Sequence, residues 1–147
     1  MKTITLFAAM LLCIGASFAI AQDGALPRSP APAESSLYII SPADGETVSS
    51  PVTVKFGLKG MGVAPAGVQM ANTGHHHLLI DVATLPPDTL PLPATDQVRH
   101  FGAGQTETTV ELSPGRHTLQ LVLGDHLHIP HQPPVRSERI TITVSGN

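Results

Sequence analysis

Proline and glycine interrupt this chain so often that no segment carries an amphipathic helical stripe of three turns. The 147 residues include 14 prolines and 13 glycines. Proline removes a backbone donor from a helix or sheet, and glycine weakens both structures. The apolar runs between these residues are short, and several of them alternate at the two-residue period of a β-strand. The pattern therefore predicts an all-β fold.

The alternating runs predict six to seven short strands. A loop at 113–116 with the sequence SPGR is typical of a hairpin turn, so we expect the strands on either side of it to pair. A domain of this size with this many strands favours an immunoglobulin-like antiparallel β-sandwich that lacks the cysteine–tryptophan core signature. The expected strands are 37–40, 52–58, 75–82, 98–101, 106–112, 117–123 and 139–144.

The first 21 residues of the chain indicate export. Lys2 precedes an apolar run from Ile4 to Phe18, and a small-residue pattern ends at Ala21. This order is typical of a secretory signal peptide over residues 1–21, and the run is too short for a membrane span. We expect a periplasmic protein without a membrane span in its mature chain. Residues 22–36 read as a flexible Pro-rich tether, and residues 37–145 as a single β-sandwich domain.

Composition excludes several functional classes. The only cysteine, Cys13, lies in the predicted signal peptide, so a mature chain would be neither a disulfide scaffold nor a thiolate metal protein. Removing Lys2 leaves 7 basic against 11 acidic side chains, a net charge of −4 with neutral histidines. Such a chain does not attract a phosphate backbone, so nucleic acid is not an expected partner.

All eight histidines lie at or after His75, and their spacing is the strongest functional signal. Alternate residues of a strand share a face, so His75 and His77 form a chelating pair, while residues 76, 78, 80 and 82 face the core. His126 and His128 repeat that spacing, at the rim that His75 reaches if the two strands are antiparallel neighbours. His100 and His131 are further candidate ligands. Imidazole nitrogens bind transition metals at about 2.0–2.1 Å.

Other residues near these histidines allow two interpretations. His76 and His117 are expected to be structural. Asp81 and Asp125 either orient ligand imidazoles or are solvated carboxylates. Met61 and Met70 either offer soft sulfur to Cu(I) or cover a core.

The segments NTGHHHLLID, HFGAGQTET and PGRHTLQLVLGDHLHIPHQPPV resemble a family of bacterial exported domains of unknown function, number 4399. The resemblance spans about Tyr38 to Val144 and implies that seven histidines form one signature; at Val98 this chain lacks a further histidine of the family pattern. A looser similarity, through SPADGETV, connects the chain to CopC-like periplasmic copper carriers. Many of those carriers bind Cu(II) through an N-terminal histidine, and Gln22 cannot act in that way.

The leading hypothesis is a periplasmic metal-binding protein that uses the histidines to bind, store or transfer Cu(II), with zinc as the second choice. Its partners would be the metal ion and a periplasmic metal donor or acceptor protein. Affinity should fall as the pH drops through about 6–6.5, because ligand imidazoles must be neutral. The first alternative is a non-catalytic interaction module with structural histidines. The second is a metal enzyme, which the absence of HExxH and GxSxG motifs disfavours.

Overall fold

A computed structural model describes residues 26–146 of the protein, so the predicted signal peptide at 1–21 lies outside the described residues. Within residues 26–146 the regular structure consists of strands alone, in two sheets of three and six strands, which confirms the all-β prediction. No helix in this range is long and apolar enough to cross a membrane.

The smaller sheet has the strand order β1-β3-β7. Strand β1 covers Ser36–Ser41, β3 covers Val52–Lys59 and β7 covers Glu107–Val110. Both neighbouring pairs are antiparallel. Val52, Val54 and Phe56 alternate with exposed residues along β3, so one face of this sheet is apolar and the other faces solvent.

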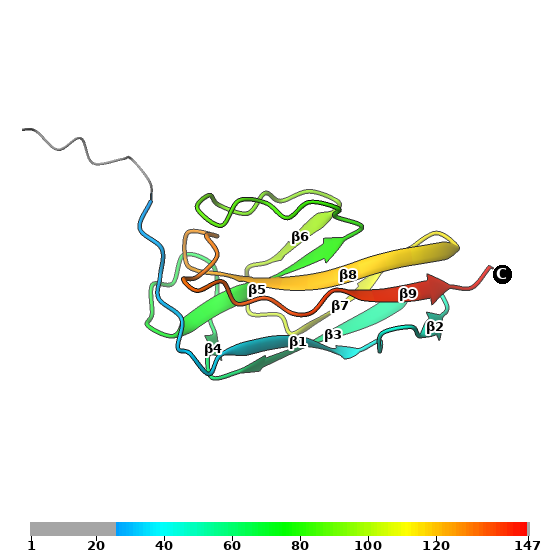
Figure 1. Cartoon of the computed structure of the whole chain (residues 1–147), viewed down its shortest axis with the longest axis horizontal. Helices are drawn as coiled ribbons and strands as arrows, with labels where there is room; N and C mark the ends of the chain where they lie inside the picture. The colour runs from blue at the N-terminus through cyan, green and yellow to red at the C-terminus, as the bar shows by residue number, and fades with distance from the viewer. Residues whose placement is uncertain (1–25, 147) are drawn as a thin grey trace, which may run out of the picture.

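The larger sheet has the order β2-β9-β8-β5-β4, and β6 also pairs with β5. Figure 1 shows β5, β8 and β9 side by side, with β1 and β3 beneath them. The bounds are Thr47–Val48 for β2, Gly62–Val63 for β4, Thr73–Ile80 for β5, Val98–Phe101 for β6, Gly115–Gly124 for β8 and Ile140–Val144 for β9.

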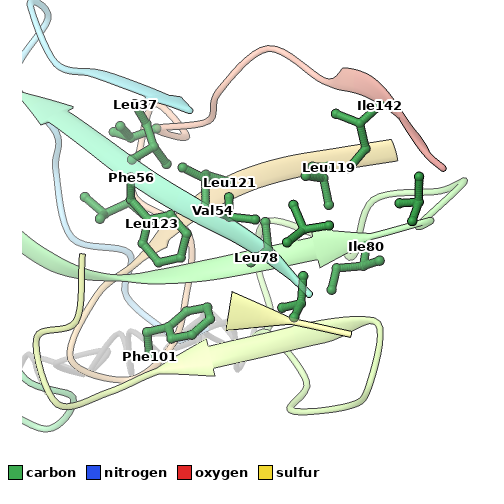
Figure 2. Packing of buried hydrophobic residues seen from close by; sticks show 14 residues of the cluster. Leu37, Val54, Phe56, Leu78, Ile80, Phe101, Leu119, Leu121, Leu123 and Ile142 are labelled. Carbon is green, nitrogen blue, oxygen red and sulfur yellow. The ribbon is translucent and has the colours of Figure 1, made fainter. Parts of the chain in front are cut away.

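The two sheets enclose one apolar core. Val54 and Phe56 of the smaller sheet meet Leu78, Leu121 and other residues of the larger sheet, as Figure 2 shows. Each of these side chains is at most 4% exposed. At about 25 cal/mol for each Å² of apolar surface removed from water, such burial is the main force that holds the sheets together.

Each of the seven expected strands overlaps a strand of the structure, but the pairing differs in two ways. The strands flanking the SPGR turn do not form a hairpin: β7 pairs with β3, whereas β8 pairs with β5 and β9. The buried Val110 packs into the core from the smaller sheet, so the chain crosses between sheets at this turn. The sandwich is also not wholly antiparallel, because β2 pairs with β9 and β4 with β5 in parallel.

Strand β5 is buried on both faces, so the surroundings of its histidines depend on which face each one occupies. Leu78 and Ile80 face the core between the sheets, as the alternation predicts, but Val82, which was expected on the same face, packs outside that core because β5 ends at Ile80. Leu79, on the opposite face, packs in a second apolar cluster with Leu92 and Val98, which lie in and beyond the loop that follows β5. The odd-numbered face therefore points toward the loop that follows β5.

Candidate metal centre

The register of β5 and β8 brings the two histidine-rich segments to one rim. The strands are antiparallel, and His75 near the start of β5 lies opposite Gly124 at the end of β8. The segment containing His126, His128 and His131 follows directly. The neighbourhood inferred from the sequence is therefore confirmed.

Strand β6 adds a third ring on the other edge of β5. His77 and His100 are directly opposed in the antiparallel β5–β6 pair. The centroids of their rings are 5.2 Å apart, and those of His75 and His77 are 4.8 Å apart. Neighbouring positions on one sheet face thus supply three imidazoles without any bend in the chain.

His128 supplies the fourth ring from the loop after β8. Its Nδ1 lies 3.1 Å from Nε2 of His75. The centroid of its ring is 4.7 Å from that of His100 and 6.0 Å from that of His77. Each of the four residues offers one nitrogen, and these four nitrogens lie within 4.8 Å of one another. We call His75, His77, His100 and His128 the four-histidine group.

The spacing of the nitrogens is close to that of a ligand shell. Four nitrogens at about 2.05 Å from one ion in tetrahedral geometry would be about 3.3 Å apart. The observed upper limit is 4.8 Å, so the most widely separated nitrogens would have to approach by about 1.5 Å to form that shell. His75 and His77 are buried, His128 is partly buried and His100 is exposed, so the group opens to solvent on one side.

Two glycines leave space for the rings. A Cβ atom added to Gly124 would lie 2.7 Å from Cε1 of His77, and one added to Gly102 would lie 2.2 Å from Cε1 of His100. Real Cβ atoms essentially never come so near another heavy atom. The sequence patterns did not single out either glycine, although Gly102 directly follows β6 and Gly124 is the last residue of β8.

The buried imidazoles are held neutral. Burial, followed by repulsion from His128 and His100, lowers the pKa of His75 to about 4. Burial and repulsion from His75, His100 and His128 lower the pKa of His77 to about 3. Burial and the neighbouring His128 also lower the pKa of His100. Neutral imidazole is the form that binds a metal ion.

Several ring nitrogens of the group lack partners. Among the residues that the structure describes, neither ring nitrogen of His77 has a hydrogen-bond partner, and neither does Nδ1 of His75. Both side chains are at most 1% exposed, so water does not satisfy these atoms. A buried polar atom without a partner costs about 1–3 kcal/mol, and a metal ion bound to one nitrogen of each ring would offset part of that cost.

Two of the six predicted ligands, His126 and His131, lie outside the four-histidine group. The ring of His131 faces the carbonyl oxygen of Thr73 at 3.1 Å. His126 and His131 both line a separate cavity of about 230 Å³. The strand rule fails for the pair at 126 and 128 because β8 ends at Gly124, so these residues belong to a turn.

The remaining histidines have structural contacts. Nδ1 of His76 lies 3.2 Å from the carbonyl oxygen of Gln105, and its ring packs on Phe56. His117 contacts the carboxylate of Asp81 at 2.7 Å. Burial lowers the pKa of His117, but its hydrogen bonds to Asp81 and to a backbone carbonyl outweigh that effect and raise it. The structural interpretation of both histidines agrees with these contacts.

The other candidates from the sequence do not reach the group. Asp81 contacts His117, which is not a member, and Asp125 accepts hydrogen bonds from backbone amides and from Ser29. Met61 packs against the apolar core, and Met70 is 63% exposed and lines the separate cavity. The group is therefore made of imidazole alone.

Fold and site together define an all-β domain with a four-histidine cluster able to hold a metal ion. The family model described as domain of unknown function DUF4399 matches residues 54–145, and the chain belongs to that family. No curated protein and no solved structure matches the chain. The looser similarity to CopC-like copper carriers is accordingly not shown.

Proposed function

We propose that this protein is an exported metal-binding protein that holds one transition-metal ion in the four-histidine group. The observation that carries the proposal is the convergence of four imidazole nitrogens within 4.8 Å at a partly buried rim. His77 strengthens it, because the ring is 0% exposed and has no hydrogen-bond partner among the described residues. A purely structural histidine would be expected to pair at least one ring nitrogen, as His76 does with the carbonyl oxygen of Gln105.

The ligand type favours Cu(II), with Zn(II) second. Imidazole suits copper, zinc and nickel, and the intrinsic affinity of nitrogen sites for divalent ions peaks at copper. The group contains neither a thiolate nor a thioether, the ligands that select Cu(I). An oxidising periplasm, reached through the signal peptide proposed for residues 1–21, would keep copper in the divalent state.

Binding and transfer fit the group better than catalysis. Catalytic zinc sites use three protein ligands and leave the fourth position open, whereas four protein ligands close a tetrahedral shell. The exposed His100 and the partly buried His128 form the solvent side of the group. A periplasmic donor or acceptor protein could replace these two ligands first while His75 and His77 keep hold of the ion.

The strand orders of the two sheets support the proposal that the fold is an immunoglobulin-like sandwich. Sheets β1-β3-β7 and β9-β8-β5 correspond in chain order to the A-B-E and G-F-C strands of that class. The parallel partner β2 would then extend the second sheet beside its last strand. This assignment places the four-histidine group at the rim where the C and C′ strands meet the loop after strand F.

The test is metal binding by a matched pair of variants. His128→Gly removes one ligand at a position whose φ of 66° glycine adopts readily, so the fold should be kept. His126→Ala removes a histidine of the same loop that lies outside the group. Each protein is dialysed against micromolar Cu(II) or Zn(II) and its metal content is measured by elemental analysis.

We expect one ion per chain for the wild type and for His126→Ala, and an affinity at least about tenfold lower for His128→Gly. Wild-type protein that retains no metal would refute the proposal. Equal retention by all three proteins would show that the ion binds elsewhere. If the wild type retains no metal, the histidines would be structural parts of an interaction module, and added metal would leave the thermal unfolding midpoint unchanged.

A further inference from the structure

The loop that presents His128 has a backbone geometry that its side chain does not favour. The amide of His128 donates to the carbonyl of Asp125 at 2.9 Å, and the amide of Asp125 donates to the carbonyl of Ile129 at 2.9 Å. This is a three-residue hairpin loop with a left-handed residue at its last position, where glycine is the usual choice. His128, with φ 66°, occupies that position. Histidine adopts the left-handed region more often than most residues other than glycine, but the conformation is still uncommon, so contacts from neighbouring residues help to hold it.

The carboxylate of Asp125 spans the turn. Its Oδ1 accepts hydrogen bonds from the amides of Leu127 at 2.9 Å and Ile129 at 3.1 Å, the residues on either side of His128. Asp125 is only 1% exposed, although it carries a charge. A buried carboxylate is costly unless hydrogen bonds satisfy it, and these two bonds satisfy one oxygen.

The N-terminal segment satisfies the other oxygen. Oδ2 of Asp125 accepts a hydrogen bond from Oγ of Ser29 at 2.8 Å and a longer one from the amide of Ser29 at 3.4 Å. The neighbouring Arg28 donates through Nε to the carbonyl of Pro130 at 3.0 Å, and through Nη2 to the carbonyl of His131. Four side-chain or backbone donors from residues 28 and 29 thus contact the loop from outside.

We propose that Asp125, held by Ser29, is the positioning residue that fixes His128 as the fourth ligand of the metal centre. The inference rests on the proposed metal-binding function, and it assigns Asp125 a role distinct from direct ligation or from orienting an imidazole. With Asp125 in place, the turn projects the His128 ring onto His75. Without it, the turn loses the acceptor that joins residues 127 and 129, and His128 relaxes away from the left-handed region.

Three variants separate positioning from charge. Asp125→Asn keeps the side-chain shape but has one acceptor oxygen in place of two, so it cannot accept hydrogen bonds from the amides of Leu127 and Ile129 and from the amide of Ser29 at the same time. Ser29→Ala removes one hydrogen bond to Asp125 without any change in charge. Asp81→Asn is the charge-matched control, because Asp81 contacts His117 at the far end of β5. Zn(II) affinity is measured for each folded protein by competition with a chromogenic chelator.

Loss of an outer partner of a ligand typically lowers metal affinity by about 10–100-fold. We expect Asp125→Asn to fall in that range, Ser29→Ala to lose a few fold, and Asp81→Asn to match the wild type. In a His128→Gly background the additional effect of Asp125→Asn should disappear, because the ligand it positions is gone. Wild-type affinity in Asp125→Asn, or an equal loss in the His128→Gly background, would overturn the proposal.

A second measurement does not depend on metal. In the metal-free protein, amide hydrogen exchange at Leu127 and Ile129 should speed up in Asp125→Asn and, less strongly, in Ser29→Ala. Unchanged exchange at both amides would refute the positioning role even if metal binding were lost. If exchange speeds up in the variants but the wild-type protein binds no ion, the proposed function and the ligand role of His128 are both refuted, while the contact of Asp125 with the loop is upheld.

Discussion

The metal-free protein should lose stability in mild acid because of His77. Burial and the neighbouring histidines hold its pKa at about 3, whereas in an unfolded chain its pKa would have the ordinary histidine value of 6.5. Between pH 3 and pH 6.5, His77 is therefore neutral in the native state and protonated in the unfolded state. Stability is full above pH 6.5, falls as the pH drops below 6.5, and continues to fall until about pH 3.

The size of the effect follows from the two pKa values. Between pH 6.5 and pH 5 the unfolded state gains about 1.36 kcal/mol per pH unit from protonation at this one site, while native His77 stays neutral. The loss from His77 alone is thus about 2 kcal/mol at pH 5. This is a large share of the 5–15 kcal/mol that typically separates folded from unfolded domains.

Urea unfolding at pH 7 and pH 5, with a chelator present, measures this loss. His77→Leu replaces the ring with an apolar side chain that does not titrate, so its stability should fall by about 2 kcal/mol less than that of the wild type. His126→Gln is the control, and its pH dependence should follow the wild type. A wild-type stability that is equal at both pH values, or an equal fall in His77→Leu, would refute the reasoning.

Two further predictions concern other contacts. Asp81→Asn removes the partner that raises the pKa of His117. A raised histidine pKa stabilises the folded protein below pH 6.5, and this stabilisation is lost as the pH rises through the pKa of the folded state. The variant should therefore lose about 0.5 kcal/mol of unfolding free energy at pH 5.5 and less at pH 8.5, as measured by urea unfolding. Gly124→Ala would place a Cβ atom 2.7 Å from the His77 ring. It should lower both the unfolding midpoint and the Zn(II) affinity, and unchanged values of both would show that the ring moves aside freely.

The sequence predicted the strands well and their pairing less well. Alternation and turn residues locate all seven longer strands, since these signals are local. The wrong hairpin at SPGR shows the limit, because a turn signal marks a reversal without stating which sheet the next strand joins. The backbone pairing decides that question: Val110 of β7 pairs with Val52 of β3, a residue far away in the chain.

The candidate site shows the same division. His75 and His77 could be paired from spacing alone, because β5 is extended and the two-residue rule applies. The two-residue rule does not apply to His126 and His128, since the chain turns after Gly124 and only His128 joins the group. His100 was a weaker candidate from the sequence, and only its register opposite His77 gives it a place in the group.

The hydrogen bond between Ser29 and Asp125 joins residues 96 positions apart. His75 and His128, which also meet, are 53 positions apart. No short stretch of the chain therefore contains the complete ligand set in its bound arrangement. A chain in transit through a membrane in an unfolded state would hold metal weakly, and tight capture would begin only when the first and last parts of the domain have come together. The order of events would be folding first and loading second, so the compartment where the chain folds, rather than the one where it is made, would determine which ion it acquires.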